Sequence, residues 1–226
     1  MIKYSLIISQ SMFLNTILNI IFPTHCVSCG ILGLYFCSEC LSKCPYAERE
    51  SAEWIFPLYD YRHPPIKKAV WLIKYKGKKK LIGVFAESLY GRIAEELTEI
   101  AVMENFSSPI LIPIPLSRKR LRERGFNQAE LLCKEIIKLD KNKFLELGKN
   151  ILTKPKDTEH QARIRDRKLR LKNLTGSFEV KNEKNLKGRN IILIDDVTTT
   201  GATLSEAKKV LRHAGARKII AFTIAH

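Results

Sequence analysis

The stretch IILIDDVTTTGAT, Ile191–Thr203, decides how the rest of this chain is interpreted. Its four leading aliphatic residues show no polar alternation, so they predict a strand that is buried on both faces of a sheet. Asp195 and Asp196 come directly after those four residues. Because open parallel sheets bind ligands beyond the carboxyl ends of their strands, the two carboxylates are expected in a ligand site.

The loop after the aspartates has the composition of a phosphate site. Backbone N–H groups at the start of a helix attract anions, threonine hydroxyls add donors, and Gly201 lets the backbone approach closely. A ribose 5-phosphate would fit both parts, with its diol on the carboxylates and its phosphate on the loop. The plainer interpretation is a capped strand–turn–helix, for which one capping residue would suffice.

Other phosphate motifs are absent from the sequence. There is neither G-x-x-x-x-G-K-[ST] nor G-x-G-x-x-G. An aspartyl-phosphate pattern would need a second acid at the position of Val197.

Strand patterns alternate with helical ones along the chain, which predicts an α/β fold with a mostly parallel, twisted sheet flanked by helices. The predicted strands besides Ile191–Ile194 are Trp54–Tyr61, Pro109–Ser117 and Lys218–Ala225, and Asn173–Val180 is predicted as a turn followed by a strand. The predicted helices are Pro64–Lys76, Leu81–Leu97, Phe126–Leu139 and Ala202–Ala214.

Five of the six cysteines lie between positions 26 and 44, which marks a separate N-terminal unit. Two C-x-x-C pairs separated by a short loop suit one tetrahedral Zn²⁺ with a structural role. Cys44 or His25 could replace one ligand, and disulfides are the weaker alternative because no secretion signal is present. The predicted zinc ligands are Cys26, Cys29, Cys37 and Cys40. We therefore predict a zinc-ribbon module over residues 1–52 and a larger domain over 53–226.

The charge is strongly positive, with 39 Lys+Arg against 23 Asp+Glu and a net charge of +16. The basic residues concentrate in Lys67–Lys80, Arg118–Arg124 and Lys154–Lys172. Such clusters indicate an anionic partner, such as nucleic acid or a phosphate compound. A solvated lysine surface is the alternative for much of 76–80.

The N-terminal segment is apolar but interrupted by polar residues, so it predicts no membrane span. It also lacks a cleavage site of the A-x-A kind, and a cytoplasmic location is therefore expected. Leu14, Ile17, Leu18 and Ile21 recur with helical period and predict an amphipathic helix that breaks at Pro23. No role is assigned to residues 1–11.

Two stretches together resemble a known family. IILIDDVTTTGAT looks like the motif with which type I phosphoribosyltransferases bind phosphoribosyl diphosphate (PRPP), and IPIPLSRKRLRERGFNQAELL, Ile112–Leu132, resembles the ComF subgroup. A cysteine-rich module before the transferase fold is also similar to that family. The resemblance covers nearly the whole chain, and it implies the type I phosphoribosyltransferase fold with an N-terminal zinc ribbon.

The resemblance also implies roles for individual residues. Asp195 and Asp196 would hold the ribose hydroxyls. The 5-phosphate would be cradled by Thr198, Thr199, Thr200, Gly201, Ala202 and Thr203. The family's pyrophosphate loop corresponds to Pro115, Leu116 and Ser117, and the diphosphate would be flanked by Arg118, Lys119, Arg124, Asn127 and Gln128.

Further matches are less specific. Lys74 and Lys76 match a basic pair of the family, although a helix face with snorkelling lysines is an equal alternative. The segment 125–128 could be a plain helix entry with Asn127 as its cap. The family's flexible lid is matched by Gln161, Arg167 and Asn173.

By this resemblance the protein would bind PRPP with Mg²⁺ and be linked to DNA uptake, natural transformation or DNA processing. It would be a phosphoribosyltransferase whose acceptor no residue run identifies. The alternative is a competence factor that senses PRPP and binds nucleic acid without turnover. Implied partners are single-stranded DNA and proteins of DNA uptake or recombination.

Overall fold

The computed structural model describes residues 23–48, 52–104, 106–155, 176–181 and 183–226. By its internal contacts the chain divides into two compact units, Met1–Cys44 and Pro45–His226. In the first unit, the described residues include one short helix, α2 (Ser38–Ser42), which contains Cys40 and is preceded by Cys37, and a turn over 27–29 next to Cys26 that includes Cys29.

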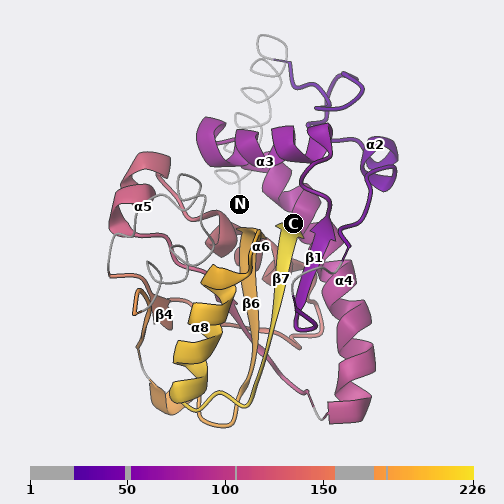
Figure 1. Ribbon diagram of the computed structural model, residues 1–226. Helices are drawn as coiled ribbons and strands as arrows, with labels where there is room; N and C mark the ends of the chain where they lie inside the picture. Colours follow the sequence, from indigo (N-terminus) through magenta and orange to yellow (C-terminus); the bar gives the residue numbers. More distant parts are fainter. Residues whose placement is uncertain (1–22, 49–51, 105, 156–175, 182) are drawn as a thin grey trace, which may run out of the picture. The chain divides into compact units, whose positions relative to one another are not determined.

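The second unit is built on a parallel sheet of five strands in the order β1-β7-β6-β2-β3 (Figure 1). Its strands are β1 (Ile55–Tyr59), β2 (Ile110–Pro113), β3 (Glu146–Leu147), β6 (Asn190–Val197) and β7 (Lys218–Ala225). Central β6 pairs with β2 and β7, and Ile194 lies opposite Pro113 on one side and Phe222 on the other. A separate antiparallel pair consists of β4 (Leu152–Thr153) and β5 (Glu179–Val180).

Helices cover both faces of the sheet. Helix α8 (Ala202–His213) packs its Leu204 and Leu211 into a cluster with Ile191 and Leu193 of β6. The other face carries α6 (Gln128–Leu139), which packs on β2 and β6, and α4 (Lys80–Glu104), which packs on α6 and β7. Both faces of β6 are therefore buried, which is why its sequence shows no polar alternation.

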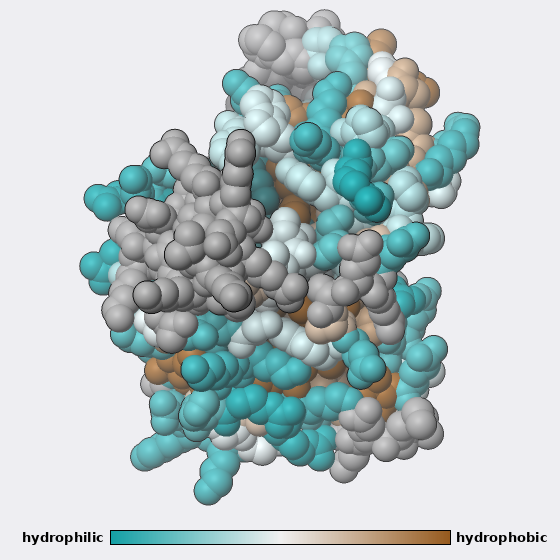
Figure 2. Space-filling model, viewed as in Figure 1, coloured by the Kyte–Doolittle hydropathy of each residue, from teal (hydrophilic) through white to brown (hydrophobic). Residues whose placement is uncertain are grey.

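Two more helices lie near the carboxyl ends of the strands. Helix α3 (Pro64–Lys76) starts with two prolines and stops at Gly77, whose φ of 62° is left-handed. Helix α5 (Arg118–Arg124) is capped by the Ser117 hydroxyl, which accepts from the Arg120 amide. On the face seen in Figure 2, most described side chains are hydrophilic, and apolar ones show mainly between them.

The predicted fold class is confirmed, and so are most predicted elements. The predicted bounds of α3 and β7 match those observed, whereas α4 runs on to Glu104 and α6 begins at Gln128 with Asn127 as its cap. Helix α5 was not predicted, because a segment that is basic except for Leu121 and Glu123 has no apolar period.

The strand that carries the aspartates is longer than its aliphatic run. It continues through Asp195 and Asp196 to Val197, because β7 offers Thr223 and Ala225 as partners for Asp195 and Val197. The prediction that the strand ends at Ile194 was wrong for this reason. The segment 173–180 was predicted as a turn followed by a strand, and its described part has a turn at Gly176 followed by β5, which contains only Glu179–Val180.

The division between the two units falls before the predicted domain boundary at residue 52. Tyr46 pairs antiparallel with Tyr59 of β1, and the Ala47 amide donates to the Leu58 carbonyl. Residues 45–47 are therefore part of the second unit. The assignment of 1–52 and 53–226 as functional domains stays a prediction.

Candidate functional site

The two aspartates lie side by side at the end of β6. Asp196 is buried, with 8% of its surface exposed, and its backbone N–H donates to Asp195 Oδ1 over 2.8 Å. Burial raises the pKa of Asp195 to about 7, and the neighbouring charge of Asp196 acts in the same direction. This carboxyl is thus poised to gain or lose a proton near neutral pH.

Two cations approach the Asp196 carboxylate from different elements. Lys74 Nζ, from α3, lies 2.9 Å from Asp196 Oδ1, and Arg124 Nη1, from α5, lies 4.0 Å from Oδ2. The side chains of both cations are largely buried, with 16% and 11% exposed. Arg124 Nη1 is itself held by Gln128 Oε1 at 3.0 Å. Sequence positions as far apart as 74, 124 and 196 therefore meet at one carboxylate.

A cavity of about 300 Å³ opens at this point. It is lined by residues from β6 and α8, from the loop after β2, and from α3 and α5. Nine residues that the sequence assigned to the site line it: Lys74, Pro115, Leu116, Ser117, Arg124, Asp195, Asp196, Thr199 and Thr203.

The remaining predicted residues lie outside the cavity wall. Asn127 caps α6 by accepting from the Ala129 amide, and its Nδ2 donates to the Ile114 carbonyl over 3.0 Å. It thereby holds the loop after β2, which agrees with the capping alternative. Lys76 is exposed, with its Nζ 5.6 Å from the centroid of the Trp71 ring. Arg118 and Lys119 are exposed on α5 and also do not line the cavity.

Some threonines of the loop after β6 line the cavity and others do not. Thr199 and Thr203 line the cavity, whereas Thr198 is 4% exposed and its amide donates to the Ala225 carbonyl. Among the described atoms, Thr198 Oγ1 is buried without a hydrogen-bond partner. Thr200 Oγ1 accepts from the Ala202 amide over 3.4 Å, so this hydroxyl caps the helix start.

Gly201 makes the turn between β6 and α8 with a left-handed φ of 68°. A side chain at this position would meet Ile55 Cδ1 at 3.0 Å from its Cβ. Glycine is therefore needed both for the backbone angle and for the close approach to β1.

Six residues that line the cavity were not assigned from the sequence. They are Tyr61, Tyr75, Ile114, Arg120, Lys154 and Val197. Lys154 is 9% exposed, and its Nζ lies 5.1 Å from the centroid of the Phe178 ring. Lys154 belongs to a noted basic cluster, but nothing in the sequence distinguishes it from the exposed lysines near it.

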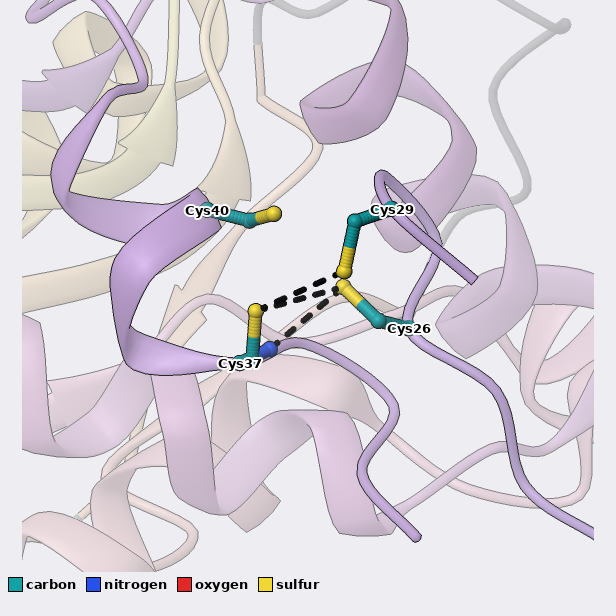
Figure 3. Close-up of side chains that lie close together, drawn as sticks. All are labelled: Cys26, Cys29, Cys37 and Cys40. Carbon is teal, nitrogen blue, oxygen red and sulfur yellow. Dashed lines mark hydrogen bonds between the residues drawn. The ribbon is translucent and has the colours of Figure 1, made fainter. Parts of the chain in front are cut away.

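The four predicted zinc ligands converge in the first unit (Figure 3). Their sulfur atoms all lie within 4.8 Å of one another, with Cys26 Sγ and Cys29 Sγ at 3.7 and 3.8 Å from Cys37 Sγ. Tetrahedral thiolates at Zn–S distances of about 2.3 Å would lie about 3.8 Å apart. The cluster therefore has the geometry to bind zinc.

Local structure supports a thiolate at Cys26. Cys37 caps α2, and its amide donates to Cys26 Sγ over 3.5 Å. Burial raises the pKa of Cys26, but hydrogen bonds from the backbone of Cys37, Cys29 and Ser28 outweigh it and lower the pKa to about 6. Backbone amides thus favour the charged form that binds metal.

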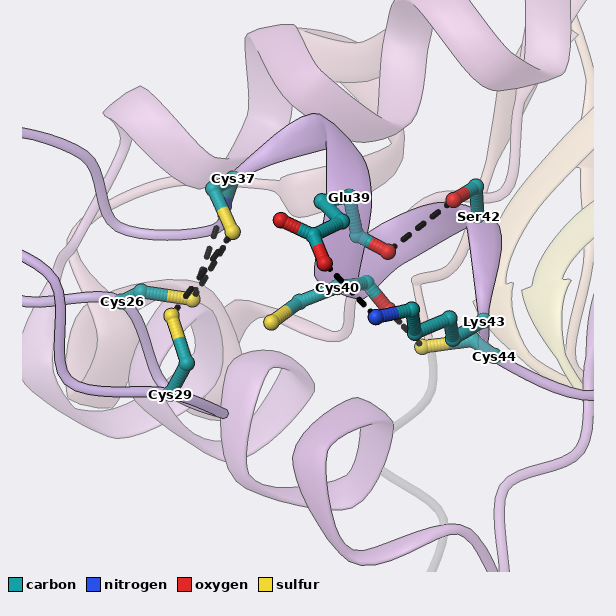
Figure 4. Close-up of polar contacts among 8 residues, drawn as sticks. All are labelled: Cys26, Cys29, Cys37, Glu39, Cys40, Ser42, Lys43 and Cys44. Atoms are coloured by element: carbon teal, nitrogen blue, oxygen red, sulfur yellow. Dashed lines mark hydrogen bonds and ion pairs between the residues drawn. The ribbon is translucent and has the colours of Figure 1, made fainter.

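The alternative ligands and the disulfides are not supported. Cys44 Sγ donates to the Cys40 carbonyl over 3.3 Å, apart from the four sulfurs (Figure 4), and His25 Nδ1 lies 3.1 Å from the Gly30 carbonyl. All six cysteines are free thiols. Cys133 is fully buried inside α6.

Two other sequence predictions fall outside the described residues: the N-terminal amphipathic helix and the lid residues Gln161, Arg167 and Asn173. Within the described part of the chain, no helix combines the length and apolar character required to cross a membrane.

Comparison with known proteins finds a family model and several relatives that are similar in sequence. A family model described as phosphoribosyl transferase domain matches residues 138–226, which include β6, the threonine loop and α8. A DNA utilization protein, YhgH, of Shigella flexneri is 27% identical over 201 residues, covering 87% of this chain and 81% of that protein.

Two competence proteins are also similar. Competence protein ComFC of Bacillus subtilis is 32% identical over 160 residues, covering 70% of this chain and 59% of that protein. Competence protein F of Haemophilus influenzae is 29% identical over 207 residues, covering 88% of this chain and 82% of that protein.

Matches to solved structures are more distant. A hypoxanthine phosphoribosyltransferase of Trypanosoma cruzi has 11% identity and a TM-score of 0.38, covering 64% of each chain. The chain is thus similar in sequence to the competence proteins F and ComFC and to YhgH, and its residues 138–226 match the model of the phosphoribosyl transferase domain.

Proposed function

We propose that this protein binds PRPP with Mg²⁺ in the cavity at the carboxyl end of β6 and acts in DNA uptake or DNA processing. The observation that carries the proposal is the pair Asp195–Asp196, held at the strand end with Lys74 and Arg124 against it. Their charges and the adjacent threonine loop suit a sugar that carries anionic groups on both sides. The names of the relatives support the role in DNA use.

In this proposal, each group of residues that lines the cavity binds a different part of PRPP. Asp195 and Asp196 accept hydrogen bonds from the ribose hydroxyls, and Thr199, Thr203 and the start of α8 hold the 5-phosphate. The loop Pro115–Ser117 contacts the diphosphate. Mg²⁺, when bound with PRPP, neutralises the diphosphate oxygens.

The chemistry that follows is substitution at C1 of the ribose. The bond from C1 to the diphosphate oxygen breaks, its electron pair leaves with pyrophosphate, and an acceptor forms the new bond to C1. Positive charge develops on the sugar, and the adjacent carboxylates stabilise it. Whether this turnover takes place or the protein only senses PRPP is decided by pyrophosphate release with a panel of acceptors.

Calorimetry tests the binding site directly. We expect PRPP with Mg²⁺ to bind the wild-type protein, and the double variant Asp195→Asn, Asp196→Asn to lose detectable binding. The variant keeps the size of both side chains, so a loss reports the charges. Equal affinities in the two proteins would place PRPP elsewhere.

The competing function is a PRPP sensor that binds single-stranded DNA and has no turnover. The basic residues Lys74, Arg120 and Arg124 at the cavity, with exposed Tyr75 beside them, favour it. It predicts DNA affinity that falls steeply with salt, together with no pyrophosphate release.

A structural zinc ion in the first unit is part of the proposal, on the sulfur geometry. So is a cytoplasmic location, because thiols that hold a metal persist in a reducing compartment. Proteins of DNA uptake or recombination are the proposed partners, on the names of the relatives alone.

A further inference from the structure

A second, smaller cavity adjoins the first. Its volume is about 190 Å³, and it is lined by Lys74, Tyr75, Gly77, Arg120, Glu123 and Arg124. We call it the arginine cavity. Four of these six residues also line the larger cavity, so the two spaces are separated only by side chains that they share.

The residues that line the arginine cavity are not those proposed to bind the diphosphate or the 5-phosphate of PRPP. No residue of the loop 115–117, of β6 or of the threonine loop lines it. An occupant would therefore contact neither the proposed diphosphate loop nor the proposed phosphate loop. It would share Lys74 and Arg124, the two cations within 4.0 Å of Asp196, and would so lie beside the ribose.

The charge of the arginine cavity indicates an anion. Three cations face one acid, Glu123, and two of those cations already neighbour Asp196. Among the described residues, no carboxylate lies within ion-pair distance of the Arg120 guanidinium. Burial lowers the pKa of Arg120 and the charge of Arg124 lowers it further, whereas Tyr75, Asp195 and Asp196 act in the opposite direction. A bound anion would oppose the lowering of the Arg120 pKa by burial and by Arg124, because its negative charge compensates both guanidinium groups.

One wall of the arginine cavity is aromatic. Tyr75 is 54% exposed, and its ring centroid lies 6.0 Å from that of Trp71, which is 45% exposed. Arg124 Cζ lies 5.7 Å from the centroid of Tyr75. Gly77 also lines the cavity and has no side chain that would fill it. Exposed rings next to guanidinium planes are surfaces on which a planar ring stacks.

We propose that the arginine cavity is the acceptor subsite, and that it takes a planar aromatic acceptor bearing a carboxylate or phosphate. This rests on the proposed function. The anionic group pairs with Arg120, the ring stacks on Tyr75, and the acceptor's nitrogen or oxygen reaches C1 past Lys74 and Arg124. That atom forms the bond to C1, pyrophosphate leaves with the electron pair, and the acceptor's proton goes to water.

Matched probes test this in the full-length protein by calorimetry. Orotate is compared with uracil for the carboxylate, and phenyl phosphate with phenol for the phosphate. We expect the charged member of at least one pair to bind at least tenfold more tightly, and the stronger pair identifies the anionic group. Inorganic phosphate alone should bind more weakly than either charged probe.

Two variants on α5 make the test specific. Arg120→Gln should remove the preference for the charged probes, whereas Arg122→Gln, an exposed arginine that lines neither cavity, should keep it. Arg120→Gln should also lower probe affinity by a larger factor than PRPP affinity. A larger loss for PRPP would assign Arg120 to the diphosphate and overturn the proposal.

The remaining outcomes are also decisive. Equal affinities within both pairs, no probe binding up to millimolar concentration, or inorganic phosphate binding as tightly as the aromatic probes would each overturn the acceptor subsite. PRPP titration of the wild-type protein is scored separately. Absence of PRPP binding with intact probe discrimination would remove the proposed function and leave an anion site of another kind.

Discussion

At the scale of single residues, the charges of Asp195 and Lys74 are central to the candidate site. A carboxyl at the end of a buried strand loses solvation, and its neighbour Asp196 adds repulsion, so its pKa is raised to about 7. Lys74 and Arg124 reduce the cost of keeping Asp196 charged. The sequence predicted both aspartates, but it could not assign Lys74 a partner 122 positions away (196 − 74).

The raised pKa of Asp195 makes the stability of the protein depend on pH. Between pH 4 and 7 the folded state keeps a proton that the unfolded chain releases, so stability falls as pH rises through this range. Asp195→Asn cannot titrate and can still accept from the Asp196 amide. It should therefore be more stable than wild type at pH 8, by about 1–4 kcal/mol, and no more stable at pH 4.

Thermal unfolding of both proteins at the two pH values measures this difference. Asp60→Asn is the control, because hydrogen bonds from Arg62 lower the pKa of Asp60. Asp60→Asn should be no more stable than wild type at pH 8. A wild-type protein that matches Asp195→Asn at both pH values would contradict the raised pKa.

Lys74 and Lys76 offer a matched pair on one helix. Lys74 lies 2.9 Å from Asp196, whereas exposed Lys76 lies over Trp71. Lys74→Met should weaken PRPP binding at least tenfold, because a charge-assisted contact contributes about 1.5–3 kcal/mol. Lys76→Met should stay within twofold. Calorimetry of both variants checks this, and equal effects would favour the alternative in which both lysines only cover the helix face.

At the scale of elements, the turn from β6 into α8 connects the two halves of the candidate site. The threonine loop was predicted as a cradle of hydroxyls, but packing divides its members. Thr198 is buried and its amide is bound to β7, Thr200 caps the helix, and only Thr199 and Thr203 of these four line the cavity. Residue types alone could not predict this division, because it depends on where β7 ends.

Gly201 should be the most sensitive position of this turn. Gly201→Ala places a side chain in a left-handed conformation, at about 1–2 kcal/mol, and its Cβ would meet Ile55 Cδ1 at 3.0 Å. Denaturant unfolding should show a loss of at least that size. Gly91→Ala in α4, where the added Cβ meets nothing within 4 Å, should instead gain about 0.5–1 kcal/mol. A neutral Gly201→Ala would argue against the observed turn.

At the scale of the whole molecule, the chain consists of two units that are stabilised differently. The second unit has a core of aliphatic residues on both faces of its sheet. In the first unit, the described buried hydrophobic residues are few, namely Cys26, Val27, Phe36 and Cys44. Because the described residues of this unit bury so little apolar surface, a metal bound by the four cysteines would add to its stability.

The purified protein should therefore contain about one equivalent of zinc, bound by four thiolates. Cys40→Ser should lower the zinc content below half an equivalent, and Cys44→Ser should leave it unchanged. A strong chelator should unfold the first unit and leave the thermal transition of Pro45–His226 in place, because no predicted zinc ligand lies there. Metal analysis and calorimetric scans measure both; zinc-free protein with an intact first unit would contradict the site.

The sequence by itself determined the α/β class, most of the helices and strands, the four clustered cysteines and the strand–aspartate–threonine motif. These are local patterns of period, spacing and composition, which neighbouring residues in the chain are sufficient to specify. Only the tertiary structure decided which basic residues face Asp196. It selected Lys74 over Lys76, brought Arg120, Tyr61 and Lys154 to the cavity, and left Arg118 and Lys119 on the surface. The physical reason is that charges in a cluster look alike in sequence, and only the packing of α3 and α5 against the ends of the strands sets which of them are buried together.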